Sequence, residues 1–197
     1  QVMLLKPSFN FAPSKKISVG IGFTYFDSFA NGENHASIKK NEMRVWQHFT
    51  YNTLLGNTIF NNRFVFEERF KDVIDKTQNP NIINGTSYAQ RFRYRVTIAF
   101  NLFSLKNEKF ILGKVSNELR IRFKNGLSES EFDQNNFGTY IGYKLYNRSE
   151  LWLGYGRDFA KVNSNLFLSY HLLHVSWAYN FDFSKSNKKA VQIARLF

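Results

Sequence analysis

The sequence predicts an all-β fold, an antiparallel up-and-down transmembrane β-barrel with 10 to 12 strands in full. Three observations lead to this class. Thr86–Phe103 alternates between polar and apolar residues over most of its length, which is the period of a strand. Eight further segments alternate in the same way, and the connections between them are short and long in turn. No apolar run approaches the roughly 20 residues of a membrane-spanning helix.

Thr86–Phe103 has the clearest pattern. One face carries Arg91, Arg93 and Arg95, and the other carries aromatic and aliphatic residues such as Phe92 and Tyr94. If the apolar face contacts lipid and the polar side chains fill a closed interior, no second layer of structure is needed. The alternative is a soluble, lipocalin-like or other closed barrel with its apolar faces turned inward. We favour the membrane orientation because acidic residues on neighbouring strands suggest that the arginines are enclosed.

Nine strands are predicted in chain order. They cover Val2–Phe11, Ile17–Phe26, Glu42–Tyr51, Thr58–Phe70, Thr86–Phe103, Phe110–Phe123, Asn135–Tyr146, Glu150–Tyr155 and Leu166–Phe183. Long loops are expected at Asp27–Lys40, Lys71–Gly85, Lys124–Gln134 and Asp158–Asn165. Residues 1–183 form the predicted barrel, and the polar tail Ser184–Phe197 is expected in the periplasm. Because bacterial barrels have even strand numbers and begin in the periplasm, at least one strand is expected ahead of Gln1.

Composition restricts the possible partners. The 197 residues carry a formal net charge of +12 and include no cysteine, so the chain has no disulfide and no thiolate metal site. A basic chain can bind nucleic acid or an anionic membrane. The arginines lie inside strands and no nucleic-acid recognition motif is present, so we expect no nucleic-acid partner. The expected partners are outer-membrane lipid, lipopolysaccharide and other outer-membrane proteins.

The polar faces of successive strands bring together a set of charged residues that forms the candidate site. Its members are Glu42, Arg44, Arg63, Glu67, Arg69, Arg91, Arg93, Arg95, Glu118, Arg120 and Arg122. One interpretation is a network of salt bridges that fills a small barrel. The other is an anion-selective lumen or binding pocket, since arginines outnumber acids.

Further residues on the polar faces have structural interpretations. Trp46 is expected to face inward and plug the barrel. The small residues of Ile17–Phe26 leave room for long neighbours; they are Ser18, Gly20, Gly22 and Thr24. Aromatic residues expected near the membrane boundaries are Tyr25, Tyr51, Tyr143, Tyr155, Trp177 and Tyr179.

Catalytic chemistry has weak support. A lipid hydrolase needs a serine beside a histidine base. The candidates are His48, His171, His174, Ser169 and Ser176. His174 and Ser176 share a face, but there is no Gly-x-Ser-x-Gly motif, and His35 is expected in a loop. With no His-x-His or His-Glu-x-x-His spacing, we expect no metal site. We also expect no cofactor and no catalytic residue.

Several segments carry a family resemblance. They are NEMRVWQHF at Asn41–Phe49, NRFVFEERF at Asn62–Phe70, RFRYR at Arg91–Arg95, NEL at Asn117–Leu119 and FDQNNFGTYIGYKL at Phe132–Leu145. In this order they resemble an uncharacterised family of outer-membrane-type β-barrels common in Bacteroidota, a domain of unknown function. Val65 and Asn136 depart from the family pattern, which has arginine there. The resemblance implies a fold and a location but no activity.

The expected function is therefore that of an integral outer-membrane protein of a Gram-negative bacterium. We expect it to be non-enzymatic, a structural or accessory subunit of a larger outer-membrane complex. The alternatives are a narrow anion-preferring channel and a lipid- or lipopolysaccharide-modifying enzyme.

Overall fold

The computed structural model describes residues 2–30, 37–105, 109–124, 127–144, 149–162 and 166–179. β-Strands occupy most of these ranges, which contain no α-helix long and apolar enough to cross a membrane. The strands are β1 (Val2–Leu5), β2 (Ser8–Phe11), β3 (Ile17–Ser28), β4 (Lys40–Leu55), β5 (Thr58–Asp75), β6 (Ile82–Leu105), β7 (Lys109–Lys124), β8 (Glu129–Lys144), β9 (Ser149–Lys161) and β10 (Phe167–Tyr179).

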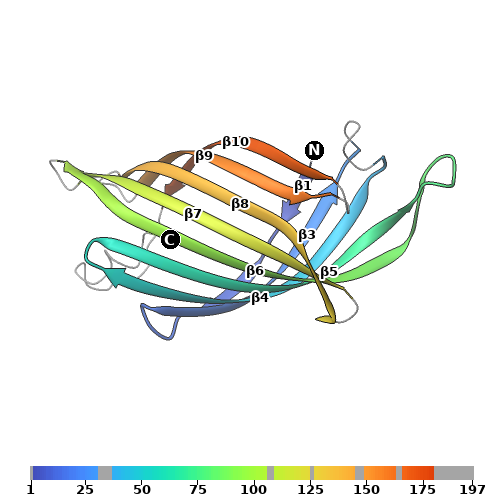
Figure 1. The fold of residues 1–197 in the computed structure, drawn as a ribbon, viewed down its shortest axis with the longest axis horizontal. Coiled ribbons are helices and arrows are strands. Elements are labelled where there is room, and N and C mark those ends of the chain that lie inside the picture. The colour runs from blue at the N-terminus through green and yellow to red at the C-terminus, as the bar shows by residue number, and fades with distance from the viewer. Residues whose placement is uncertain are drawn as a thin grey trace. The chain divides into compact units, whose positions relative to one another are not determined.

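The strands form one sheet in which sequence neighbours are spatial neighbours. The order runs β1-β3-β4-β5-β6-β7-β8-β9-β10, and β2 also pairs with β3 (Figure 1). The pairings of β8 with β9 and of β9 with β10 are antiparallel, with Gly138 opposite Gly156 and Gly156 opposite Leu172. The predicted all-β, up-and-down strand order of a β-barrel is confirmed.

The first predicted strand, Val2–Phe11, is interrupted. Leu5 pairs with Tyr25 and Ser8 pairs with Gly22, so β1 and β2 keep one register along β3. Between them stands Pro7, which has no N–H to give to the ladder. Its carbonyl still accepts a hydrogen bond from the Phe23 N–H at 3.1 Å. The prediction of one strand is thus wrong at Lys6 and Pro7, which belong to neither strand.

β3 to β9 are longer than the sequence pattern predicts, and the loops between them are correspondingly shorter. The loop predicted at Lys71–Gly85 is wrong at both ends, because β5 runs to Asp75 and β6 begins at Ile82. Main-chain hydrogen bonds continue a ladder through polar residues, where side-chain alternation fades.

The same error recurs at three other connections. β3 ends and β4 begins inside the loop predicted at Asp27–Lys40, and β8 begins inside that at Lys124–Gln134. β9 extends to Lys161, beyond the predicted strand Glu150–Tyr155 and into the loop predicted to follow it. His35 and the tail Ser184–Phe197 lie outside the described residues.

Burial alternates along the strands, and the buried side chains are mainly polar whereas many of the exposed ones are apolar. Along β4, Val45 and Phe49 are exposed whereas Trp46, His48 and Thr50 are buried. Among the described residues, thirteen buried side chains are polar or charged and six are hydrophobic. Strands such as β4, β5 and β9 therefore have an exposed apolar face and a buried polar face, the reverse of the soluble alternative, whereas β10 is exposed on both faces.

The chain divides into two compact units, which we describe separately. The first comprises the described parts of Gln1–Thr50, Arg63–Tyr94 and Arg120–Asp133. The second comprises the described parts of Tyr51–Asn62, Arg95–Leu119 and Gln134–Phe197.

Candidate functional site

Glu67 on β5 is the most deeply buried acid of the first unit, with 2% of its surface exposed. It accepts a hydrogen bond from Arg91 Nε at 2.7 Å and another from Arg93 Nη1 at 2.6 Å. Arg91 and Arg93 are two residues apart on β6, so both project from one face. A buried carboxylate is tolerated when such charge-assisted hydrogen bonds replace its water.

Glu42 on β4 forms a second centre with two arginines. Arg44 and Arg69 each donate from Nε to its Oε1 at 2.6 Å. Arg69 adds a bond from Nη2 to Oε2 at 3.2 Å and so binds the carboxylate with two nitrogens. The fork of arginine matches a carboxylate in this way, which fixes β5 against β4.

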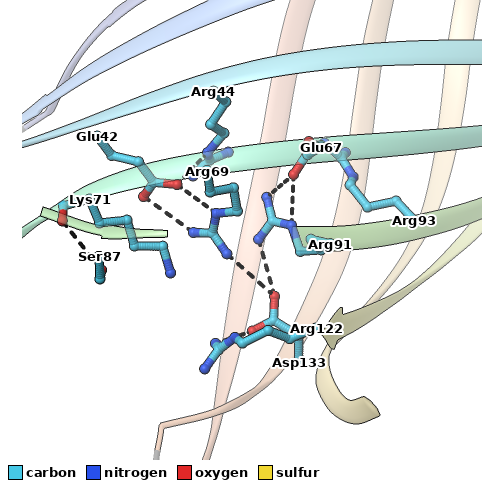
Figure 2. A network of polar contacts seen from close by, with 10 residues as sticks. All are labelled: Glu42, Arg44, Glu67, Arg69, Lys71, Ser87, Arg91, Arg93, Arg122 and Asp133. Atoms are coloured by element: carbon cyan, nitrogen blue, oxygen red, sulfur yellow. Dashed lines mark hydrogen bonds and ion pairs between the residues drawn. The ribbon is translucent and has the colours of Figure 1, made fainter. Parts of the chain in front are cut away.

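Asp133 on β8 joins the two centres (Figure 2). It accepts a hydrogen bond from Arg91 Nη1 at 3.1 Å and lies 3.9 Å from Arg69 Nη1. It also accepts a hydrogen bond from Arg122, whose Nη1 lies 3.5 Å from Glu131. A continuous chain of ion pairs therefore leads from Glu42 to Glu67 through Asp133. We call this set the arginine–carboxylate network.

The network has more positive than negative groups. Its arginines are Arg44, Arg69, Arg91, Arg93 and Arg122, and its acids are Glu42, Glu67, Glu131 and Asp133. Lys71 stands beside it, with Glu42, Arg69, Arg122 and Asp133 as electrostatic neighbours, and forms no ion pair with a described residue. Arg122 Nε is buried without a hydrogen-bond partner in the same ranges. The arrangement can hold strands together and can attract an anion.

The structure brings seven of the predicted site residues into this network, namely Glu42, Arg44, Glu67, Arg69, Arg91, Arg93 and Arg122. Arg95 and Glu118 belong to the second unit, where their nearest charged atoms are 4.0 Å apart. Arg63 and Arg120 are half-buried on β5 and β7.

Sequence reasoning missed Asp133, Glu131 and Lys71. All three lie in segments predicted as loops, although β8 and β5 include them. The available signal was the two-residue spacing of Glu129, Glu131 and Asp133, which is the period of a strand.

The second unit holds an aromatic cluster around a lysine. Lys114 Nζ lies 4.5 Å from the centre of the Tyr140 ring and 4.3 Å from that of Trp152. Trp152 Nε1 donates to Glu150 at 3.2 Å. A lysine between two aromatic faces is stabilised by cation–π attraction. The cluster fills the polar face of β7, β8 and β9.

Trp46 is buried, with 5% of its surface exposed. Its Nε1 donates to Thr24 Oγ1 at 2.9 Å, and its ring lies against Gly22, where a Cβ atom would come within 2.6 Å of Trp46 Cε2. The small residues of β3 thus make room for the indole. His48 occupies the same kind of space against Gly20.

Three of the residues considered for catalysis, Ser169, His171 and His174, have other neighbours. Tyr155 Oη and His171 Nδ1 are 2.5 Å apart, and Arg157 Nε donates to Ser169 Oγ at 3.0 Å. The ring of His174 lies 5.7 Å from that of Tyr140. Among the described residues, no three histidine, aspartate or glutamate side chains gather as metal ligands.

Together these features define a class: an all-β protein with the strand order of an up-and-down barrel, an exposed apolar face and a buried, charged polar face. Within that class, the chain belongs to the family described as "Protein of unknown function (DUF2490)", whose family model matches residues 1–167. The predicted membership of an uncharacterised family is confirmed. Comparison with curated proteins and with solved structures gave no match.

Proposed function

We propose that this protein is an integral β-barrel protein of the outer membrane of a Gram-negative bacterium, with a non-catalytic, structural or accessory role in a larger outer-membrane assembly. The observation that carries the proposal is the distribution of burial. Apolar side chains are exposed and charged side chains are buried within the same strands.

The exposed face is too apolar for water. Leu173, Val175 and Trp177 on β10 are 78%, 69% and 70% exposed. Burying a large apolar side chain is worth about 1.5–3 kcal/mol, and a soluble monomer rarely leaves a contiguous apolar patch above a few hundred Å² in water. Contact with acyl chains removes this penalty, and a closed β-barrel is one of the two architectures that can span a bilayer.

The buried face suits an enclosed polar interior. The charged groups of the arginine–carboxylate network are held by one another, with Arg91 and Glu67 only 3% and 2% exposed. Removing an ion from water costs several kcal/mol unless partners compensate. A network in which each acid meets at least one arginine favours a rigid, filled interior, and hence a structural role for the barrel.

Fractionation of native cells tests the location. We expect the protein to sediment with the outer membrane on a density gradient and to resist extraction by alkaline carbonate. We also expect it to refold into lipid vesicles and to remain with them on flotation. Recovery in the soluble fraction, or release by carbonate, would contradict the proposal. Purification from those membranes in mild detergent should retain partner proteins if the role is accessory.

A second candidate function is a narrow anion-preferring channel. Two observations favour it: the excess of arginine over acid in the network, and the Lys71 ammonium beside it. Such a channel should show current in planar bilayers, with a reversal potential toward anion selectivity in a KCl gradient. Lys71→Gln should reduce that selectivity, whereas Lys76→Gln in the β5–β6 connection should not. Absence of current from the refolded protein would exclude this candidate.

A further inference from the structure

Four polar residues form a compact patch on the apolar face of the second unit. Tyr155 and Arg157 come from β9, and Ser169 and His171 from β10. Two contacts link them, Tyr155 Oη to His171 Nδ1 at 2.5 Å and Arg157 Nε to Ser169 Oγ at 3.0 Å. We call these residues the Arg157 patch.

The patch belongs to the exposed face. Arg157 pairs directly with His171, and Tyr155 pairs with Leu173 in the antiparallel register. Direct partners in a ladder project to the same side of the sheet. Arg157, Ser169 and His171 are exposed, as is Tyr155 at 44%. The guanidinium and its polar neighbours therefore interrupt a face on which the next residues, Leu153 and Leu173, are apolar and exposed.

The position along the strands is specific. On the side toward the start of β9, the exposed row continues with Leu153 and Leu151, and the last described pair there is Ser149 with Tyr179. Eight residues separate His171 from Tyr179, which is roughly 26 Å at about 3.3 Å per residue. With a strand tilt of about 40°, the row spans roughly 20 Å across a bilayer, close to the apolar band of about 25 Å in outer-membrane barrels. A row of this length covers most of that band when the patch lies at one membrane boundary.

The chemistry of the patch suits a phosphate. Arg157 forms no ion pair with a carboxylate of the described residues, so its terminal nitrogens remain available in those ranges. Arginine binds phosphate oxygens through two parallel hydrogen bonds. When the Tyr155 hydroxyl donates to Nδ1 of His171, the imidazole Nε2–H becomes a further donor.

We infer that the Arg157 patch binds the phosphate monoester of a lipid headgroup of the kind that lipid A carries. The inference rests on the proposed function, because it requires the apolar face to lie in a membrane. Leu153 and Leu173, 55% and 78% exposed, offer contact for acyl chains directly beside the patch. Phe159 and Phe167, stacked at 5.2 Å, flank its other side. A free phosphate would use the cation but not these apolar neighbours.

The test measures lipid binding by native mass spectrometry of the refolded protein in detergent micelles. The probes are bis-phosphorylated lipid A, lipid A with its phosphates removed, and inorganic phosphate. We expect retention of the phosphorylated lipid only. Arg157→Gln should weaken its binding at least roughly tenfold, since a hydrogen bond to a charged group is worth that much. Lys76→Gln removes an equal charge in the β5–β6 connection and should leave binding unchanged.

Each other outcome overturns the inference. Equal binding of lipid A with and without its phosphates would show that the patch does not recognise the phosphate. Equal losses of binding in Arg157→Gln and Lys76→Gln would mean that only the net charge matters. Tight binding of inorganic phosphate alone would mean that the site does not require a lipid. Insertion of the same variants into vesicles, assayed by carbonate resistance, separates the two claims. If insertion stays intact while phosphate selectivity is absent, only this inference fails; if the wild-type protein does not insert, the proposed function fails with it.

Discussion

Arg91 and Glu67 face each other across β6 and β5, joined at 2.7 Å, and both are almost completely removed from solvent. Asp133 accepts from the far end of the same guanidinium at 3.1 Å. One arginine of the first unit thus connects β6 with β5, its neighbour in the sheet, and with β8, two strands away. Because an unpaired charge is very unfavourable in such a place, this pair should control the stability of the polar face.

Glu67→Gln should lower the free energy of unfolding by about 3 kcal/mol, because the neutral amide leaves Arg91 and Arg93 short of a compensating charge. Urea denaturation in detergent micelles, followed by tryptophan fluorescence, measures the loss. Glu68→Gln is the matched control one residue along β5, on the other face, and should change stability by no more than about 0.5 kcal/mol. Equal effects of the two substitutions would contradict a stabilising role for the network.

The hydrogen bond from Trp46 to Thr24 makes a second prediction. Thr24→Val keeps the shape of the side chain but leaves the buried indole N–H unsatisfied, at a cost of about 1–3 kcal/mol. In a Trp46→Phe background the same substitution should cost much less, because no donor remains. A double-mutant cycle with no coupling between the two positions would show that this bond does not stabilise the protein.

Gly22 provides a third prediction, on packing. An added Cβ would overlap the Trp46 ring, so Gly22→Ala should destabilise the protein by about 1–3 kcal/mol. Ser18→Ala, on the same face of β3, adds no atom and serves as the control. Trp46→Phe should recover part of the loss by vacating the contact. A neutral Gly22→Ala would mean that the indole does not occupy this position.

The strand order was accessible from the sequence because alternation reports directly on a pleated sheet. The alternation within each strand also predicted that the side chains of Glu67, Arg91 and Arg93 lie on the polar face. The ends of the strands did not follow, as the extension of β5 to Asp75 shows. There the ladder is held by main-chain groups, which are common to all residues and leave no mark on the side-chain pattern.

The pairing of charges was also beyond the sequence. Asp133 contacts Arg91 although 42 residues separate them, and this contact depends on how β8 lies relative to β6. Similarly, the sequence allowed Ser169 and His171 as catalytic candidates, but their partners Arg157 and Tyr155 depend on the register of β9 and β10. Register is set by the turn and by the hydrophobic patterns of both strands together, so one strand alone does not reveal it.

The three tryptophans offer the most direct test of the central claim that the apolar face meets lipid. Trp177 is 70% exposed on that face, whereas Trp46 and Trp152 are 5% and 6% exposed. In vesicles of lipids with brominated acyl chains, which quench indole fluorescence on contact, a variant that retains only Trp177 (Trp46→Phe with Trp152→Phe) should be strongly quenched. Trp177→Phe, which keeps the two buried indoles, should be quenched little. Strong quenching of the buried pair with an unquenched Trp177 would contradict the account.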